Sequence, residues 1–363
     1  MAFSDLNADN TRAWEAGRSM ETGVGSGVLL GIISGALLGV FALPMKAVLR
    51  WRWENTWLMY CVWSLLILPW GLAFLTVPGI TSVIGSVSTS SLAWIFLFGF
   101  GWGIGCVLFG LGLKLVGLAL GTAIVLGLNN ALGAILPLFL SHQSAISAAS
   151  VQTLVAGVVV MLFGVVLCSW AGVQKERELV REKPGADAPA DSTERARGIL
   201  ICIGGGIIGT CFNLALVFGG ELNAAALKAG ASELNANNPV WCISLLGGFL
   251  PNIAYCSYLL NRNSGWKLFV PKKSRIDWVL AFAMGLMWLS GVAIYGMSVQ
   301  RLGNLGASIG WALIQSTAII AGNVSGFVTG EWRGTTARAK TTMAWGLCVL
   351  IVGIAVVGCS AAL

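Results

Sequence analysis

Charged residues are scarce in this chain of 363 residues, since Asp, Glu, Lys and Arg together make up only 10% of it. Soluble domains carry roughly a quarter charged residues, so this composition excludes an ordinary soluble fold. Histidine occurs once, the nine cysteines have no metal-ligand spacing, and no nucleophile–base set stands out. We therefore expect no metal site, no cofactor and no enzyme active site in a chain that is 56% hydrophobic.

Long apolar stretches occupy most of the sequence. About 20 apolar residues cross the hydrocarbon core of a bilayer as a helix, and backbone facing lipid must be helical or part of a closed barrel. The stretches are continuous rather than alternating, which favours helices. We predict an all-α integral membrane protein with ten transmembrane helices at residues 22–43, 56–77, 91–113, 117–140, 150–172, 198–219, 239–260, 277–299, 304–329 and 341–361.

Basic residues divide unequally between the two ends of these predicted helices. We call the side that holds the loop after the first helix side B; it carries 18 of the 22 Lys and Arg residues, and side A carries the rest. The positive-inside rule makes side B cytoplasmic, so both termini are expected outside. The net charge of +7 then reflects loops that face anionic lipid, and it implies no nucleic acid partner. The side B residues are Lys46, Arg50, Arg52, Lys114, Lys175, Arg177, Arg181, Lys183, Arg195, Arg197, Arg262, Lys267, Lys272, Lys273, Arg275, Arg333, Arg338 and Lys340.

The chain is expected to have four parts. Residues 1–21 are polar and lack the basic start and apolar core of a signal peptide, so they are predicted to form an external extension. Residues 173–197 form the longest charged connection and are predicted to be a cytoplasmic linker. The remaining parts, 22–172 and 198–363, each hold five predicted helices.

The two five-helix parts resemble each other when one is shifted by 186 positions. The matched pairs are Gly99 with Gly285, Trp102 with Trp288, Gly105 with Gly291, Phe109 with Tyr295, Gly110 with Gly296, Gly117 with Gly303, and Asn129 with Gln315. Because each part has an odd number of helices, the second enters the membrane in the opposite orientation. Two inverted five-helix repeats are typical of secondary transporters, which bind their substrate near the midplane, at the interface of the repeats.

Several short motifs are distinctive: PMK at 44–46, WRWENTW at 51–57, ILPW at 67–70, FG at 98–99 with WGIG at 102–105, GLMW at 285–288, and EW at 331–332. Together they resemble the L-rhamnose–proton symporter family of the drug/metabolite transporter superfamily, from about residue 27 to the end. The resemblance implies ten helices, an external N-terminus and proton-driven uptake of a 6-deoxyhexose at the bacterial inner membrane. In the family pattern Asn follows WGIG directly and Tyr stands three residues further on, where this chain has Cys106 and Phe109.

A sugar site inside a membrane needs amide or carboxyl groups for hydroxyls and an aromatic surface for the apolar ring face. The candidate substrate-binding residues are Trp102, Asn129, Asn130, Trp288, Tyr295, Trp311 and Gln315, with Asn213 and Asn252 as further amides. The repeat pairs Trp102 with Trp288 and Asn129 with Gln315, so we expect these pairs on two walls of one cavity. The alternative is that the amides tie helices together and the tryptophans fill space.

A proton-coupled carrier also needs a titratable group that reaches both sides. Glu54 follows a tryptophan at the start of the second predicted helix, and Glu221 lies at the outer end of the sixth. Carboxylates that border apolar spans are functional candidates, so we expect at least one of the two to exchange the proton. The alternative is an ordinary interfacial charge, which is how we interpret Asp277 and Glu331 beside their basic loops.

The sequence therefore favours a proton-coupled secondary transporter that imports a 6-deoxyhexose, most simply L-rhamnose, by alternating access. Its expected partners are a small sugar, protons and the lipid bilayer, and the sequence carries no signal for an oligomeric state. A drug or metabolite exporter of the same superfamily is the alternative. A membrane-embedded enzyme or sensor fits less well, because catalytic groups are not clustered and the sequence shows no soluble output domain.

Overall fold

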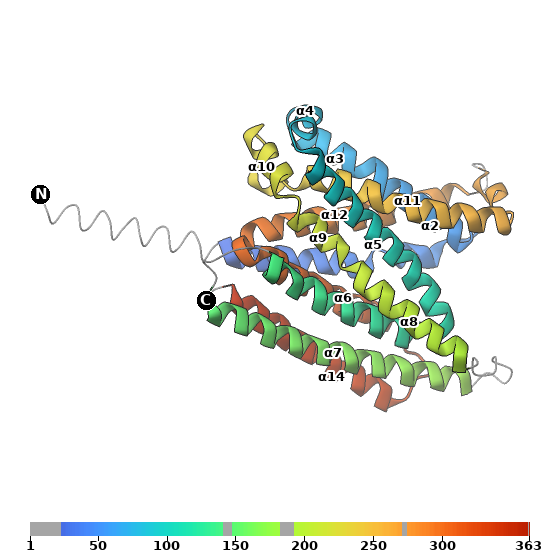
Figure 1. Ribbon diagram of the computed structural model, residues 1–363. Coiled ribbons are helices and arrows are strands. Elements are labelled where there is room, and N and C mark those ends of the chain that lie inside the picture. Colours follow the sequence, from blue (N-terminus) through green and yellow to red (C-terminus); the bar gives the residue numbers. More distant parts are fainter. Residues whose placement is uncertain (1–22, 141–146, 182–191, 271–273, 362) are drawn as a thin grey trace, which may run out of the picture.

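The computed structural model describes residues 23–140, 147–181, 192–270, 274–361 and 363. Throughout these ranges the chain consists of helices and short connections without strands, which confirms the all-α prediction. The long helices lie side by side in a bundle (Figure 1). The polar extension predicted at residues 1–21 lies outside the described residues.

Nine helical segments in the described part of the chain are long and apolar enough to cross a membrane: Gly23–Ala47, Trp53–Thr76, Thr89–Val116, Leu120–Leu140, Ala148–Glu178, Ala196–Lys228, Glu233–Arg262, Arg275–Val328 and Ala337–Ser360. The segment Arg275–Val328 contains two helices, α12 (Arg275–Leu302) and α13 (Gly306–Val328). Between them Gly303 has a φ of 65°, which glycine adopts readily. The Tyr295 hydroxyl lies 3.4 Å from the Ala307 carbonyl oxygen, so α13 turns back beside α12.

The first half of the chain begins with a helical segment at 23–40 and the short 3₁₀ helix η1 (Leu43–Ala47). It continues with α2 (Trp53–Cys61), η2 (Val62–Ile67), α3 (Leu68–Thr76), α4 (Ile80–Gly85), α5 (Thr89–Val116), α6 (Leu118–Leu140) and α7 (Ala148–Arg181). The turn η2 has π-helical geometry. Proline has no N–H for the regular ladder of helical hydrogen bonds, and Pro69 is the second residue after this turn.

The second half contains α8 (Ser192–Gly209), α9 (Cys211–Val217), α10 (Gly220–Lys228), η3 (Glu233–Asn235), α11 (Asn238–Arg262), η4 (Gly265–Phe269), α12, η5 (Gly303–Leu305), α13 and α14 (Ala337–Ser360). The charged connection predicted at 173–197 is partly helical, because α7 runs on to Arg181 and α8 begins at Ser192. Both helices therefore continue beyond their apolar parts into charged sequence.

Helix α5 packs between α8 and α11, while α7 runs along α14 at one edge of the bundle (Figure 1). Glycine makes the contact of α5 with α11 possible. A Cβ atom at Gly99 would lie 1.8 Å from the Ser244 carbonyl oxygen, and one at Gly103 would lie 2.5 Å from the Gly248 carbonyl oxygen. Small residues let membrane helices approach this closely, so the two backbones touch and hold α5 in place.

Candidate functional site: a cavity on side B

A cavity of about 590 Å³ lies among the helices. The cavity is lined on α5 by residues from Trp102 to Phe109, on α6 by residues from Thr122 to Asn129, and on α7 by residues from Val165 to Glu176. In each case these residues belong to the half of the helix nearer side B, so the cavity extends from the middle of the bundle towards that side. Glu331 also lines it, and its side chain is 44% exposed, so the cavity reaches the surface there.

Aromatic rings form the inner end of the cavity. Trp102 and Trp288 stack with ring centroids 5.6 Å apart and an interplanar angle of 22°. Phe212 packs against Trp102 at 4.9 Å. Trp311 donates from Nε1 to the Asn129 carbonyl oxygen at 2.9 Å, which fixes its ring at the wall. This arrangement brings together three of the predicted tryptophans at one end of the cavity.

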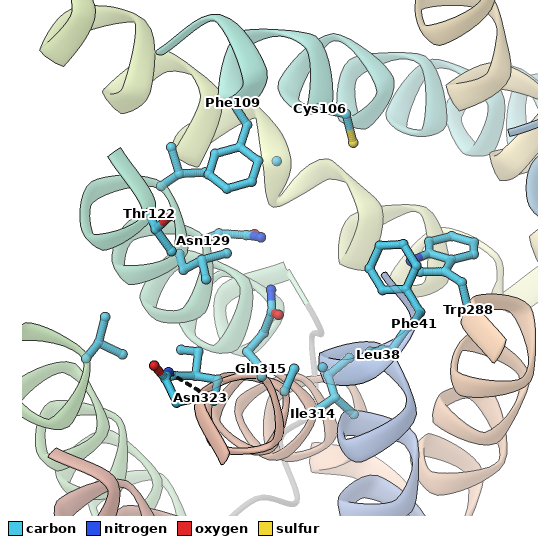
Figure 2. Close-up of a pocket in the computed structure, with 18 of the residues that line it drawn as sticks. Leu38, Phe41, Cys106, Phe109, Thr122, Asn129, Trp288, Ile314, Gln315 and Asn323 are labelled. Atoms are coloured by element: carbon cyan, nitrogen blue, oxygen red, sulfur yellow. Dashed lines mark hydrogen bonds between the residues drawn. The ribbon is translucent and has the colours of Figure 1, made fainter. Parts of the chain in front are cut away.

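Two amides face the cavity from different helices. Figure 2 shows Asn129 on α6 and Gln315 on α13 directing their side chains into the space between them. Asn129 Oδ1 is buried and accepts no hydrogen bond from any residue that the structure describes. Leaving such an oxygen unpaired costs about 1–3 kcal/mol, a cost that a bound hydroxyl group would remove. The prediction that Asn129 and Gln315 share one cavity is consistent with this geometry.

Residues that sequence reasoning missed complete the walls. Thr122 lies two turns before Asn129 on α6, and Asn323 lies two turns after Gln315 on α13, so both are nearer side B than these two amides; Figure 2 shows them in the lining. Helical periodicity could have found them, since residues seven or eight apart share a face. Much of the remaining wall is apolar, with Leu38, Phe41, Cys106, Phe109 and Ile314.

Other predicted residues lie away from the cavity. Asn130 is buried and donates from Nδ2 to the Ser316 hydroxyl at 3.3 Å. Tyr295 is also buried and donates to Asn213 Oδ1, while Asn213 Nδ2 donates to the Gly133 carbonyl oxygen at 2.7 Å. These contacts tie helices together, the alternative role considered for amides. Asn252 does line the cavity, and its Oδ1 accepts from Trp57 Nε1 at 3.1 Å.

The two predicted proton carriers lie at opposite ends of the molecule and outside the cavity lining. Glu54 is buried near side B and accepts from Asn263 Nδ2 at 2.8 Å. Glu221 on side A accepts from the Ser88 backbone N–H at 2.8 Å and from its hydroxyl at 2.6 Å. Among the described residues, no group of three or more His, Cys, Asp or Glu is arranged to hold a metal ion.

Long apolar helices around an internal cavity with amides and stacked tryptophans define a multi-pass α-helical membrane protein of the transporter class. The family model described as "L-rhamnose-proton symport protein (RhaT)" matches residues 20–363. The chain therefore belongs to the L-rhamnose–proton symport protein family, a family of transporters and not of enzymes.

Individual proteins show the same relationship. An L-rhamnose-proton symporter of Yersinia pestis (strain Pestoides F) is 27% identical over 325 residues, which cover 88% of this chain and 92% of the relative. One from Shigella flexneri is 28% identical over the same shares of both chains. A solved crystal structure with 17% identity covers 92% of this chain and 97% of its own, with a TM-score of 0.52; that likeness concerns the fold alone.

Proposed function

We propose that this protein imports L-rhamnose together with protons across the bacterial inner membrane by alternating access. The observation that carries the proposal is the opposition of Asn129 and Gln315 across a cavity that ends at stacked tryptophans. The amides supply hydrogen bonds to hydroxyl groups, and the indole rings cover the apolar face of the sugar. The relatives named as L-rhamnose-proton symporters support this choice of substrate.

The sugar site consists of Trp102, Asn129, Trp288, Trp311 and Gln315. We assign Asn130 and Tyr295, predicted from the sequence as direct ligands, to the support of these residues, because each bonds a neighbouring helix. The apolar residues of the cavity wall suit a sugar that carries a methyl group in place of one hydroxyl, because a methyl group placed against the amides would leave them unpaired.

We further propose ten transmembrane helices, arranged as two inverted repeats at residues 22–172 and 198–363. The ten are the nine apolar segments with α12 and α13 counted separately. Contacts across the expected pseudo-twofold axis support the repeat. Asn130 bonds Ser316, a residue 186 positions away, and Trp102 stacks on Trp288 at the same separation.

A second pair of contacts supports the same symmetry. A Cβ atom at Gly105 would lie 3.0 Å from the Gly209 backbone nitrogen. At the equivalent position in the second half, a Cβ atom at Gly291 would lie 2.8 Å from Leu38 and 3.3 Å from the Ser34 carbonyl oxygen. Thus α5 packs on α8 much as α12 packs on the helical segment at 23–40. Inverted repeats create this relation, because the shift of 186 positions matches α5 with α12.

We propose that side B is cytoplasmic, so that the cavity faces inward and both termini are external. The excess of basic residues on side B supports this orientation. Towards side A the bundle is closed by buried polar contacts. Asn237 donates to the Gly296 carbonyl oxygen at 2.9 Å and Asn223 donates to Asn237 Oδ1 at 2.7 Å. Alternating access then requires these contacts to open as the cavity closes on side B.

The test is uptake of labelled L-rhamnose into proteoliposomes that carry an imposed pH gradient. At one proton per sugar, a gradient of about one pH unit supports about tenfold accumulation. We expect accumulation that collapses when a protonophore dissipates the gradient. Empty liposomes and other 6-deoxyhexoses are the controls. Absence of L-rhamnose uptake under a gradient would refute the proposed function, and gradient-driven extrusion of amphipathic compounds would favour the exporter alternative.

A further inference from the structure

Three charged side chains meet at the mouth of the cavity on side B. Lys46 donates from Nζ to the Glu331 carboxylate and to the Thr329 hydroxyl, the latter at 3.0 Å. Lys175 Nζ lies 3.6 Å from Glu331 Oε2 and 4.9 Å above the centre of the Trp332 ring. We call Lys46, Lys175 and Glu331 the mouth cluster.

The mouth cluster joins elements that are far apart in the sequence. Lys46 belongs to η1 after the first helix, Lys175 to α7, and Glu331 to the connection between α13 and α14. Lys175 and Glu331 line the cavity, whereas Glu54 and Glu221 are outside its lining. A proton on Glu331 therefore reaches the same water-accessible space as the proposed sugar site.

The two ammonium groups favour the charged carboxylate in this conformation. The hydrogen bond from Lys46, with the charges of Lys46 and Lys175, holds the pKa of Glu331 below its ordinary value, although partial burial acts in the opposite direction. The other charged groups near the mouth are Glu176 on α7, which also lines the cavity, and Arg333. Because the cavity is open to side B, the lowered pKa of Glu331 favours loss of a proton to that side.

An importer driven by protons needs to release them on the cytoplasmic side after each cycle. We propose that Glu331 is the group that releases the driving proton into the cytoplasm, and that Lys46 and Lys175 trigger this release by closing on it when the cavity opens inward. This inference rests on the proposed function and adds the exit end of the proton path. For a cycle to carry a proton inward, the mouth cluster has to separate in the outward-facing state, and Glu331 has to receive its next proton from side A through the interior of the bundle.

Transport by Glu331→Gln tests the assignment. The neutral amide mimics the protonated carrier, so we expect sugar exchange between equal pools to remain while accumulation driven by about one pH unit falls from about tenfold to none. The matched control is Glu178→Gln. Glu178 accepts from the Thr336 backbone and hydroxyl at 2.9 and 2.7 Å on the same side and lies outside the cavity lining, so its variant should accumulate sugar normally.

Two results would overturn the assignment. One is accumulation by Glu331→Gln equal to that of the unaltered protein. The other is loss of both exchange and accumulation in well-folded protein, which would make the mouth cluster a structural tie. Lys46→Met and Lys175→Met add a graded test. Each removes a cation from Glu331, so proton release should require a more alkaline interior, and the internal-pH profile of accumulation should shift upward.

A measurement without sugar keeps this inference separate from the proposed function. Cys106 lines the cavity, as do Cys61 and Cys168, so alkylation by a water-soluble maleimide, measured at Cys106 itself by peptide mass spectrometry, reports how open the cavity is to side B. Protonation of Glu331 should favour the outward-facing state, so acid should slow Cys106 alkylation in the Glu178→Gln control. In Glu331→Gln the rate should be low and should lack this additional pH dependence. The same pH dependence in both variants would contradict the inference even if L-rhamnose is not the substrate.

Discussion

At the scale of single residues, Asn129 and Asn130 are neighbours on α6 whose amides serve different partners. Asn129 faces the cavity, while Asn130 bonds Ser316 on α13. Loss of an amide that bonds a sugar hydroxyl costs about 1–3 kcal/mol. We therefore expect Asn129→Ala and Gln315→Ala to weaken L-rhamnose affinity roughly 5- to 150-fold, as measured by equilibrium binding to purified protein.

Asn130→Ala is the matched control. It should lower the melting temperature, because Ser316 loses its buried partner, and it should leave L-rhamnose affinity within about twofold. Unchanged affinity in both Asn129→Ala and Gln315→Ala, with normal melting temperatures, would remove these two amides from the sugar site.

The carboxylates Glu54 and Glu221 define a second prediction at this scale. We expect at least one of them to take part in proton exchange, and Glu221 on side A lies where an incoming proton arrives first. Replacement of the participating carboxylate by Gln should abolish accumulation driven by the pH gradient and spare exchange between equal pools. The carbonyl oxygen of Gln can still accept from Asn263 at position 54, and at position 221 it can keep one of the two hydrogen bonds that Glu221 accepts from Ser88. Wild-type accumulation and pH dependence in both Gln variants would exclude both residues from the proton path.

At the scale of helices, two glycines of α5 provide a test of packing. A Cβ atom at Gly99 would lie 1.8 Å from the Ser244 carbonyl oxygen, whereas one at Gly110 would meet nothing within 4 Å. We expect Gly99→Ala to force α5 and α11 apart and to destabilise the protein by about 1–3 kcal/mol, the usual cost of overpacking. Gly110→Ala should be neutral or stabilising by up to about 1 kcal/mol, because alanine favours helix. Thermal unfolding in detergent checks both, and equal melting temperatures would contradict the close approach.

Helix positions followed from hydropathy, but several helix ends did not. The apolar part of α7 ends near residue 172, yet the helix continues to Arg181, because hydropathy reports depth in lipid rather than helical hydrogen bonding. The stretch predicted as one helix at 198–219 is divided at Thr210 between α8 and α9. The π-helical turn η2 also gave no hydropathy signal.

The candidate site was predictable where the repeat constrained it. The repeat singled out Asn129 and Gln315, and both line the cavity. Asn130 differs from Asn129 by a rotation of about 100° around a helix of 3.6 residues per turn, and composition gave no reason to prefer one face. The contact of Lys46 with Glu331 links residues 285 positions apart, so no local pattern could indicate it.

At the scale of the whole molecule, the two ends of the bundle differ in what holds them. Side B is hollowed by the cavity and carries charged contacts at its mouth, while side A is filled by aromatic rings and buried amides. Phe212 stacks on Trp241 with ring centroids 5.2 Å apart, which continues the aromatic layer behind the cavity. One arrangement closed on one side and open on the other is what alternating access predicts for a single state of a transporter.

The orientation of the molecule yields the last prediction. We propose from the excess of basic residues that side B is cytoplasmic, and α14 ends at Ser360 on side A, so the C-terminus should be external. Alkaline phosphatase, which is active only outside the cytoplasm, should be active when fused to the C-terminus, and a fluorescent protein that matures only inside should be dark there.

A fusion that ends at Gly334, between α13 and α14, provides the control because it removes the final helix. Its two reporters should show the opposite pattern, with fluorescence and no phosphatase activity. Fluorescence from the full-length C-terminal fusion would reverse the assignment of sides, and the cavity would then face outward. The mouth cluster would then exchange its proton with the external side and not with the cytoplasm.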